Sequence, residues 1–267
     1  MHRLLLIINL RTAVVVLLAI ISTWTCSHYG LMANFSVTFL LTAVIFPVVF
    51  SIHSAYERRE KALKDYATLK SNGRSLFLAL RDWIEQPQPG SLSQMRDKLE
   101  SLFDNLVRLL TSDQSAIEDN QLQVYQAFSD LSRFIRTDMR QQKMAATEVS
   151  RVNNYLNEMI LAFESIKHIY QYRTPVTLKM FGDFFVVLVP VLYGPYFAYS
   201  GQEYTSGLLY VMPVLFSIVL TALVNIRTQL ENPFDQFGED DVVFNTRRFI
   251  STLEEDPQGF GGEKIEK

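Results

Sequence analysis

The stretch from Leu31 to Ile52 reads LMANFSVTFLLTAVIFPVVFSI and carries no formal charge over 22 residues. A second uncharged run, from Tyr204 to Ile226, is 23 residues long. A helix needs about 20 apolar residues to cross the hydrocarbon core of a bilayer. Both runs are long enough to span, so the chain is predicted to be an integral membrane protein.

Two further apolar stretches are weaker candidates for spans. Leu4 to Trp24 contains Arg11, whose charge is costly at the membrane centre and much less costly at an interface. We therefore place Arg11 near the cytoplasmic headgroups. Phe184 to Gln202 is uncharged but contains Pro190 and Pro195, which spanning helices tolerate when neighbours satisfy the freed carbonyls. The sequence thus predicts four transmembrane helices, of which the third is kinked.

Charged residues are concentrated in the middle of the chain. Between Glu57 and Lys179 lie 18 of the 25 Lys and Arg and 16 of the 28 acidic residues. This near balance produces no basic field, so no nucleic-acid partner is expected. The sequence has no Gly-rich phosphate loop, no zinc-protease motif and no nucleophile elbow, so we predict that the protein is not an enzyme.

The loops predict the orientation in the membrane. The link from Thr25 to Gly30 has no Lys or Arg, whereas the flank after Ile52 is rich in them. Those flanking cations are Arg58, Arg59, Lys61, Lys64, Lys70 and Arg74. The positive-inside rule then places both termini and the middle segment in the cytoplasm, and we expect a bacterial inner membrane or its equivalent.

The middle segment is predicted to be helical nearly throughout. From Glu57 to Glu85 there is no Pro and only one Gly, so the second span should continue as a helix until Gln86-Pro-Gln-Pro-Gly90 ends it. Ser91 and Gln94 form a candidate capping box for the next helix. Apolar residues then recur at helical spacing, as expected for the core of a bundle. They include Leu99, Leu102, Phe103, Leu106, Leu122, Phe128, Val152, Met159 and Phe163.

These observations predict an all-α polytopic membrane protein with a cytoplasmic helical domain. Residues 1–56 form the first transmembrane hairpin and 57–179 the cytoplasmic domain. Residues 180–228 form the second hairpin, and 229–267 form an acidic cytoplasmic tail.

Several short motifs resemble one known family. The run Phe50-Ser-Ile-His-Ser-Ala-Tyr-Glu-Arg58 with Ala62 is similar to a Phe-Arg-Asn-x-x-x-Tyr-x-Arg-x-x-x-Ala pattern, and Glu164-Ser-Ile-Lys167 with Thr174-Pro175 is similar to Glu-Arg-Ile-Lys-x-Thr-Pro. Glu231-Asn-Pro-Phe234 is similar to a motif that follows the last span. The order and spacing of these motifs resemble the bestrophin family of ion channels, and its bacterial members in particular. The chain departs from that family at Arg58-Arg59-Glu60, where the family has Arg-Trp-Trp.

The resemblance implies a homopentamer with one central pore, lined by the second helix of each subunit. Thr42, Phe46 and Phe50 recur at intervals of four and share one helix stripe, so they are candidates for an aromatic neck. The alternative is that the two Phe side chains pack against lipid or neighbouring helices. Pro47 either lets the neck widen or is an ordinary kink of a membrane helix.

Other site residues follow from the same resemblance. Tyr56 and Arg58 would mark the cytoplasmic end of the pore helix. After the last span, carboxylates and amide carbonyls could coordinate calcium, which prefers oxygen ligands. The candidate ligands are Gln229, Asn232, Glu239, Asp240 and Asp241. The alternative is a solvated acidic tail, because residues 231–267 hold ten acidic and four basic side chains.

Three classes of function stay open, with an ion channel first, an anchored scaffold second and a transporter third. A channel for chloride or other small anions is favoured, and a cation-permeable channel of the same fold is the first alternative. A membrane-anchored helical scaffold or sensor would use the same spans without ion flux. A secondary transporter ranks third, because no internal repeat is visible.

Overall fold

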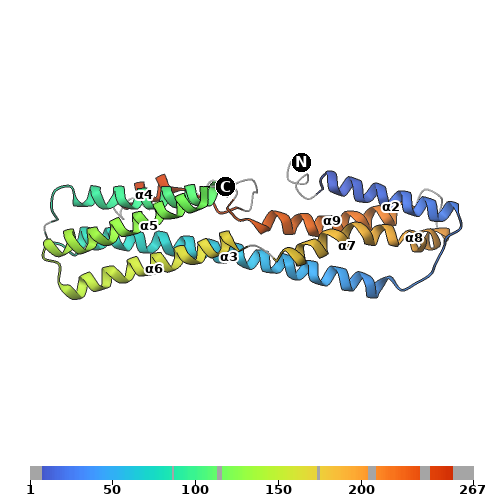
Figure 1. Ribbon diagram of the computed structural model, residues 1–267, viewed down its shortest axis with the longest axis horizontal. Helices are drawn as coiled ribbons and strands as arrows, with labels where there is room; N and C mark the ends of the chain where they lie inside the picture. Colours follow the sequence, from blue (N-terminus) through green and yellow to red (C-terminus); the bar gives the residue numbers. More distant parts are fainter. Residues whose placement is uncertain are drawn as a thin grey trace, which may run out of the picture. The chain divides into compact units, whose positions relative to one another are not determined.

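The computed structural model describes residues 8–85, 87–112, 116–172, 175–203, 209–234 and 241–254. All regular elements in these ranges are helical (Figure 1), which confirms the all-α prediction. They are α2 (Leu10–His28), α3 (Val37–Asp82), α4 (Ser91–Thr111), α5 (Ile117–Phe134), the π-helical η2 (Ile135–Met139), α6 (Ala146–Gln171), α7 (Val176–Leu192), α8 (Gly194–Ser200), the 3₁₀-helical η3 (Gly201–Glu203), α9 (Val211–Glu231) and α10 (Thr246–Glu254).

The chain divides into two compact units. The first unit contains Met1–Glu60 and Tyr172–Pro233, and the second unit contains Lys61–Gln171 and Phe234–Lys267. Helix α3 contributes its first part to one unit and its remainder to the other. It runs for 46 residues. This length confirms the prediction that the helix formed by the apolar stretch Leu31–Ile52 continues far beyond that stretch.

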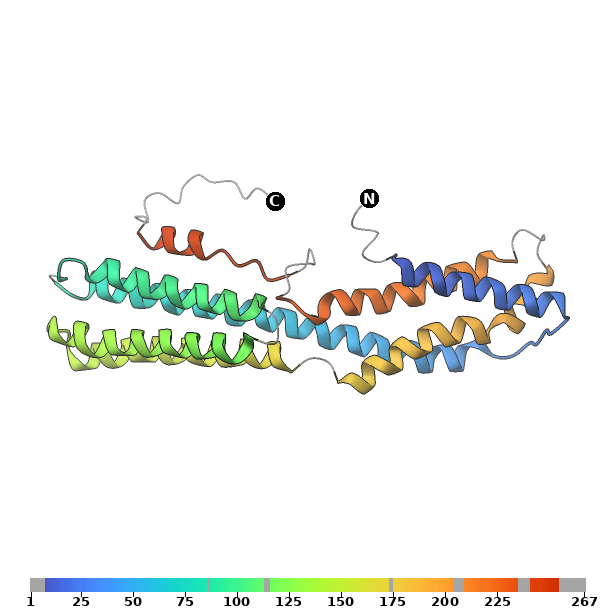
Figure 2. The same ribbon diagram turned by 45° about the horizontal axis from the view of Figure 1, so that its top comes forward.

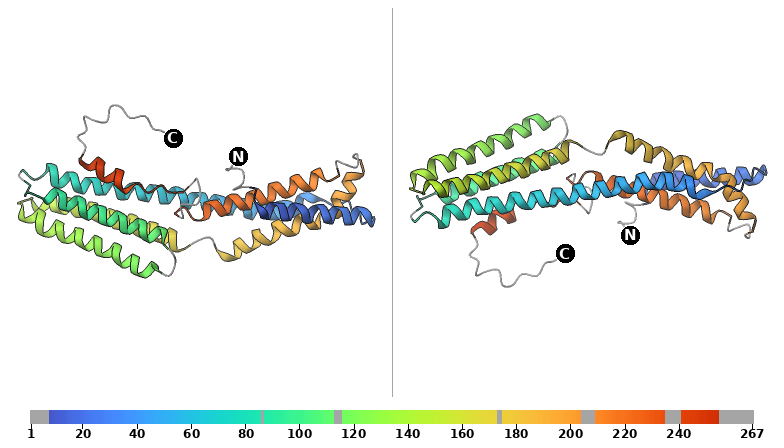
Figure 3. Two further views of the ribbon diagram at one scale, coloured as in Figure 1. Left: turned by 90° about the horizontal axis from the view of Figure 1, so that it is seen from above. Right: turned by 90° about the horizontal axis from the view of Figure 1, so that it is seen from below.

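In the first unit, α2 packs along α7, α8 and α9, and Figure 3 shows α2 and α9 side by side. Helix α2 begins at Leu10 because Asn9 and Thr12 form a reciprocal capping box. The core of the unit comes from α3, α7, α8 and α9. Its buried residues are Val44, Val48, Val186, Val189, Tyr193, Phe197, Leu220 and Val224.

The apolar stretch from Phe184 to Gln202 is broken, in keeping with the predicted kink. The break lies at Tyr193, between α7 and α8. Pro190 lies inside α7, whereas Pro195 lies in the first turn of α8. A proline there loses no helical hydrogen bond, because first-turn N–H groups have no partner in the helix. Among the described residues, α2 and α9 are long and apolar enough to cross a membrane; α6 with α7 would add a third if counted as one broken span.

In the second unit, α4 packs against α5 and α5 against α6, and Figure 2 shows α10 lying beside α4. The predicted apolar faces form its core, including Leu99, Phe103 and Met159. The prediction is wrong for Leu122, which is 56% exposed on α5. The predicted capping box at Ser91 is wrong. Gly90 is the N-cap of α4 with φ of +89°, so Ser91 is already helical and its hydroxyl instead accepts from Gln142 at 3.1 Å.

Candidate functional site

Helix α3 presents two contrasting faces within the first unit. Val44 and Val48 point into the core and expose 1% and 3% of their surface. Phe46 and Phe50 expose 60% and 56%. Thr42 is exposed as well, so the three predicted neck residues form one row that faces away from the core of their own chain.

The aromatic row is internally ordered. The rings of Phe46 and Phe50 meet edge to face, with centroids 4.7 Å apart and planes at 86°. Thr42 donates its hydroxyl hydrogen to the carbonyl oxygen of Thr38 at 2.7 Å, which satisfies that donor within the helix. Pro47 lies inside α3 and is partly exposed. It interrupts the hydrogen-bond ladder beside the two rings, as its sequence position predicted.

The exposed row continues past the residues that the sequence singled out. His53 and Glu57 follow Phe50 at helical spacing, and their side chains are 65% and 66% exposed. His53 Nε2 lies 3.3 Å from Glu57 Oε1. A step of three residues from Phe50 and then one of four would have found this polar end of the row, because both steps keep to one helix face. A carboxylate at this position favours cations, and a protonated imidazole favours anions.

Tyr56 and Arg58 lie on the same stretch of α3. Tyr56 is about half exposed. Burial lowers the pKa of Arg58, and the nearby carboxylate of Glu231 opposes that shift. Glu231 in turn accepts a hydrogen bond from Lys179 Nζ at 3.0 Å. Arg58 therefore belongs to a charged cluster that ties α3, α7 and α9 together within the first unit.

A second ionic cluster was missed by sequence reasoning. Asp183 Oδ1 on α7 forms ion pairs with Arg11 Nη1 at 3.0 Å and with Arg227 Nη2 at 2.9 Å. Arg227 exposes only 1% of its surface. Arg11 was predicted to lie near the cytoplasmic headgroups, and the structure pairs it with Asp183. Because Asp183 is 172 residues from Arg11 in sequence, no local pattern could have paired them.

The predicted calcium ligands are placed only in part. Gln229 lies in α9 and Asn232 ends that helix, both in the first unit. Asp241 is buried in the second unit, and Glu239 and Asp240 lie outside the described residues. Within the described ranges, no three or more His, Cys, Asp or Glu side chains gather in a way that could hold a metal ion. Calcium binding here stays a prediction.

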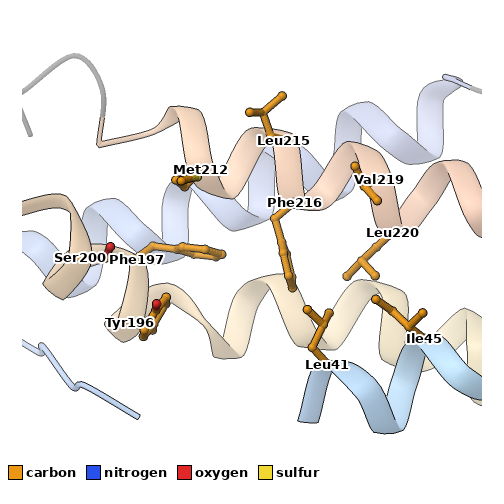
Figure 4. Close-up of a pocket in the computed structure, with 10 residues that line it drawn as sticks. All are labelled: Leu41, Ile45, Tyr196, Phe197, Ser200, Met212, Leu215, Phe216, Val219 and Leu220. Atoms are coloured by element: carbon orange, nitrogen blue, oxygen red, sulfur yellow. The ribbon is translucent and has the colours of Figure 1, made fainter. Parts of the chain in front are cut away.

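The other side of α3 contributes to an apolar groove of about 380 Å³ between α3, α8 and α9 (Figure 4). Leu41 and Ile45 of α3 line it together with Phe197 of α8 and Phe216 of α9. The described residues that line it are mostly aliphatic and aromatic. The groove therefore offers space for an apolar group.

Comparisons with known proteins identify the fold. No protein-family model and no curated protein matches the sequence. Among solved structures, a bacterial bestrophin homologue from Klebsiella pneumoniae carrying a single substitution superposes with a TM-score of 0.74 at 16% identity, covering 91% of this chain and 96% of that chain.

Two further structures give the same result. Another crystal structure of the Klebsiella pneumoniae homologue has a TM-score of 0.71 at 15% identity and covers 91% of this chain and 94% of that one. A structure described as a membrane protein has a TM-score of 0.70 at 16% identity with the same coverage. The chain therefore has the fold of the bacterial bestrophin homologues, as its motifs predicted.

Proposed function

We propose that this protein is a bestrophin-like pentameric ion channel that conducts chloride or other small anions. The observation that carries the proposal is the exposure of Phe46 and Phe50, which turn away from the core of their own chain. In five copies arranged around an axis, the row from Thr42 to Phe50 would form a narrow aromatic collar.

The physics of such a collar suits a gated anion pathway. A hydrophobic constriction empties of water easily and so blocks ions until it widens. Phe ring edges carry partial positive charge, which favours a passing anion. Pro47 weakens the helix beside the rings and gives the collar a place to deform.

The membrane arrangement is part of the same proposal. We place α2, the apolar first part of α3, the α7–α8 segment and α9 across the bilayer, which gives four spans. Residues 57–179 and 229–267 would lie in the cytoplasm, together with both termini. The cations that follow the second apolar stretch support this orientation.

Two measurements on the purified full-length protein test the proposal. Native mass spectrometry in mild detergent should give a mass of five chains. After reconstitution in a planar bilayer, the reversal potential in asymmetric sodium chloride should lie near that of chloride. A monomer without current would instead identify an anchored scaffold.

One observation favours a cation-permeable channel as the second candidate. Glu57 extends the exposed row, and its pairing with His53 is open to solvent. A ring of five carboxylates below the neck would attract cations. A reversal potential near that of sodium would select this alternative and reject the anion assignment.

A further inference from the structure

The second unit has a polar groove of about 410 Å³ between α3 and α10. Lys70 and Arg74 line one wall, and Arg248 lines the other. Ser71 and Thr252 add hydroxyl groups to the same lining. Three cations and the Ser71 hydroxyl thus face one space, while Thr252 donates its hydroxyl hydrogen to the carbonyl oxygen of Phe249.

No described carboxylate balances these cations in the groove. Among the described residues, the lining contains no Asp or Glu, and the first turn of α10 has no acidic residue. Burial lowers the pKa of Lys70, and the neighbouring cation Arg74 lowers it further. Lys70 Nζ also lies 4.7 Å from the centroid of the Tyr66 ring. Cations held close together repel one another, and a bound anion would relieve that repulsion.

The walls of the groove are held in place by packing. Phe249 of α10 is buried against Phe103, with ring centroids 4.7 Å apart. Its ring would lie 3.4 Å from a Cβ at Gly73, an ordinary van der Waals distance, so α10 packs directly against α3. Arg74 Nη2 donates to Thr252 Oγ1 at 3.0 Å, which joins the two walls. The cations are therefore presented on a fixed frame.

We propose that the groove formed by Lys70, Arg74 and Arg248 binds a phosphate-bearing anion. Guanidinium groups donate in a planar fork that matches phosphate oxygens, and the lysine adds a point charge. A phosphate offers acceptor oxygens in several directions, which suits donors arriving from two helices. A carboxylate has two oxygens on one side and could not reach both walls equally well.

Calorimetric titration of the full-length protein in lipid-free detergent with inorganic pyrophosphate tests the site. We expect saturable binding with one site per chain. Arg248→Gln and Lys70→Gln, one on each wall, should each weaken binding about tenfold or more, as expected for a lost charge-assisted contact.

Arg247→Gln is the matched control, because it removes the same charge one residue away and Arg247 is outside the groove lining. Binding by this variant should equal that of the unmodified chain. No saturable heat with pyrophosphate or with a short-chain phosphoinositide would overturn the proposal, as would equal weakening by Arg247→Gln and Arg248→Gln.

The source of the phosphate group can be separated in the same experiment. If the short-chain phosphoinositide binds much more tightly than pyrophosphate, and both groove variants weaken it, the ligand is a lipid headgroup. If pyrophosphate binds at least as tightly, the ligand is a free phosphate compound. These readouts measure binding alone and do not depend on ion conduction.

Discussion

Phe46 and Phe50 each expose more than half of their surface, although Val44 and Val48 on the same helix are buried. Burying a Phe side chain away from water contributes about 1.5–3 kcal/mol. Two exposed Phe side chains next to each other can face lipid, pack against a partner subunit or line a hydrophobic pore. The proposed pentamer assigns them to the pore.

Replacing both Phe46 and Phe50 with Ala removes the collar and should raise single-channel conductance several-fold or leave the pore constitutively open. Single-channel recording in bilayers measures this. Leu215→Ala is the control, because Leu215 is 53% exposed on α9 and lies outside the α3 row. Unchanged currents in correctly assembled double variants would remove the two Phe residues from the gate.

Glu57→Gln removes the carboxylate at the polar end of the exposed row. Because a ring of carboxylates repels anions, the variant should raise the chloride-to-sodium permeability ratio several-fold. Reversal potentials in asymmetric sodium chloride measure the ratio. Asp82→Asn, at the far end of α3, should leave it unchanged. Equal ratios in both variants would show that Glu57 does not face the ions.

The sequence predicted this site only in part. The spacing of four placed Thr42, Phe46 and Phe50 on one row, because side-chain direction in a helix follows from position alone. The extension to His53 and Glu57 was missed because the strict interval of four was not relaxed to the step of three that separates Phe50 from His53. Whether the row meets lipid or a pore depends on other chains, and no pattern within one chain encodes that.

At the scale of helices, Asp183 links three elements of the first unit through Arg11 on α2 and Arg227 on α9. A buried arginine that loses its carboxylate is left as an uncompensated charge. Gly182 fits this arrangement, because a Cβ there would lie 2.7 Å from Arg227 Nη1. The glycine thus makes room for the guanidinium.

Asp183→Asn should destabilise the first unit by roughly 3 kcal/mol, since it leaves Arg227 buried without a counter-charge. Thermal unfolding in detergent measures the loss. Gly182→Ala should also destabilise, because its methyl group displaces Arg227. Glu158→Gln, an exposed change on α6, serves as the control. An unaltered melting temperature for Asp183→Asn would mean that the cluster contributes little.

In the second unit, Lys167 Nζ donates to Tyr125 OH at 2.7 Å, and that hydroxyl donates to Glu164. Burial works to raise the pKa of Glu164, but the bonds from Lys167 and Tyr125 outweigh it and lower the pKa. A lowered folded-state pKa stabilises at pH above the unfolded value, near 4.3 for Glu, and the gain disappears as pH falls through the folded value.

Tyr125→Phe should therefore lower the melting temperature at neutral pH by an amount equivalent to about 1 kcal/mol. The difference from the unmodified chain should shrink as the pH falls through the lowered pKa of Glu164, because the carboxylate then becomes protonated. Melting curves across this pH range measure the trend. A difference that does not change with pH would exclude a role for the Glu164 charge.

Most helices were predictable because their signals are local. Period-3.6 apolar spacing identified α4 and α6, and the absence of Pro between Glu57 and Glu85 predicted the long α3. The start of α4 was misjudged because Gly90, in a left-handed conformation, replaced the Ser91 cap. The Arg11–Asp183–Arg227 cluster could not be predicted, because its members meet only after the chain has folded.

At the scale of the whole molecule, the resemblance seen in short motifs is confirmed by superposition over 91% of the chain at 16% identity. Such low identity with retained fold is understandable, because helix packing depends on apolar spacing more than on particular side chains. Fold alone does not establish function. The channel proposal therefore depends on the α3 row and its exposure.

The central claim is that Phe46 lines the axial ion pathway of the assembled protein, which is accessible from water when the collar is open. A Phe46→Cys variant, treated with a membrane-impermeant methanethiosulfonate reagent during bilayer recording, tests it most directly. Leu215→Cys on α9 is the control, and the native Cys26 is buried in both. We predict that the reagent blocks current through Phe46→Cys channels and leaves Leu215→Cys channels unaffected; unmodified current in Phe46→Cys channels would contradict the account.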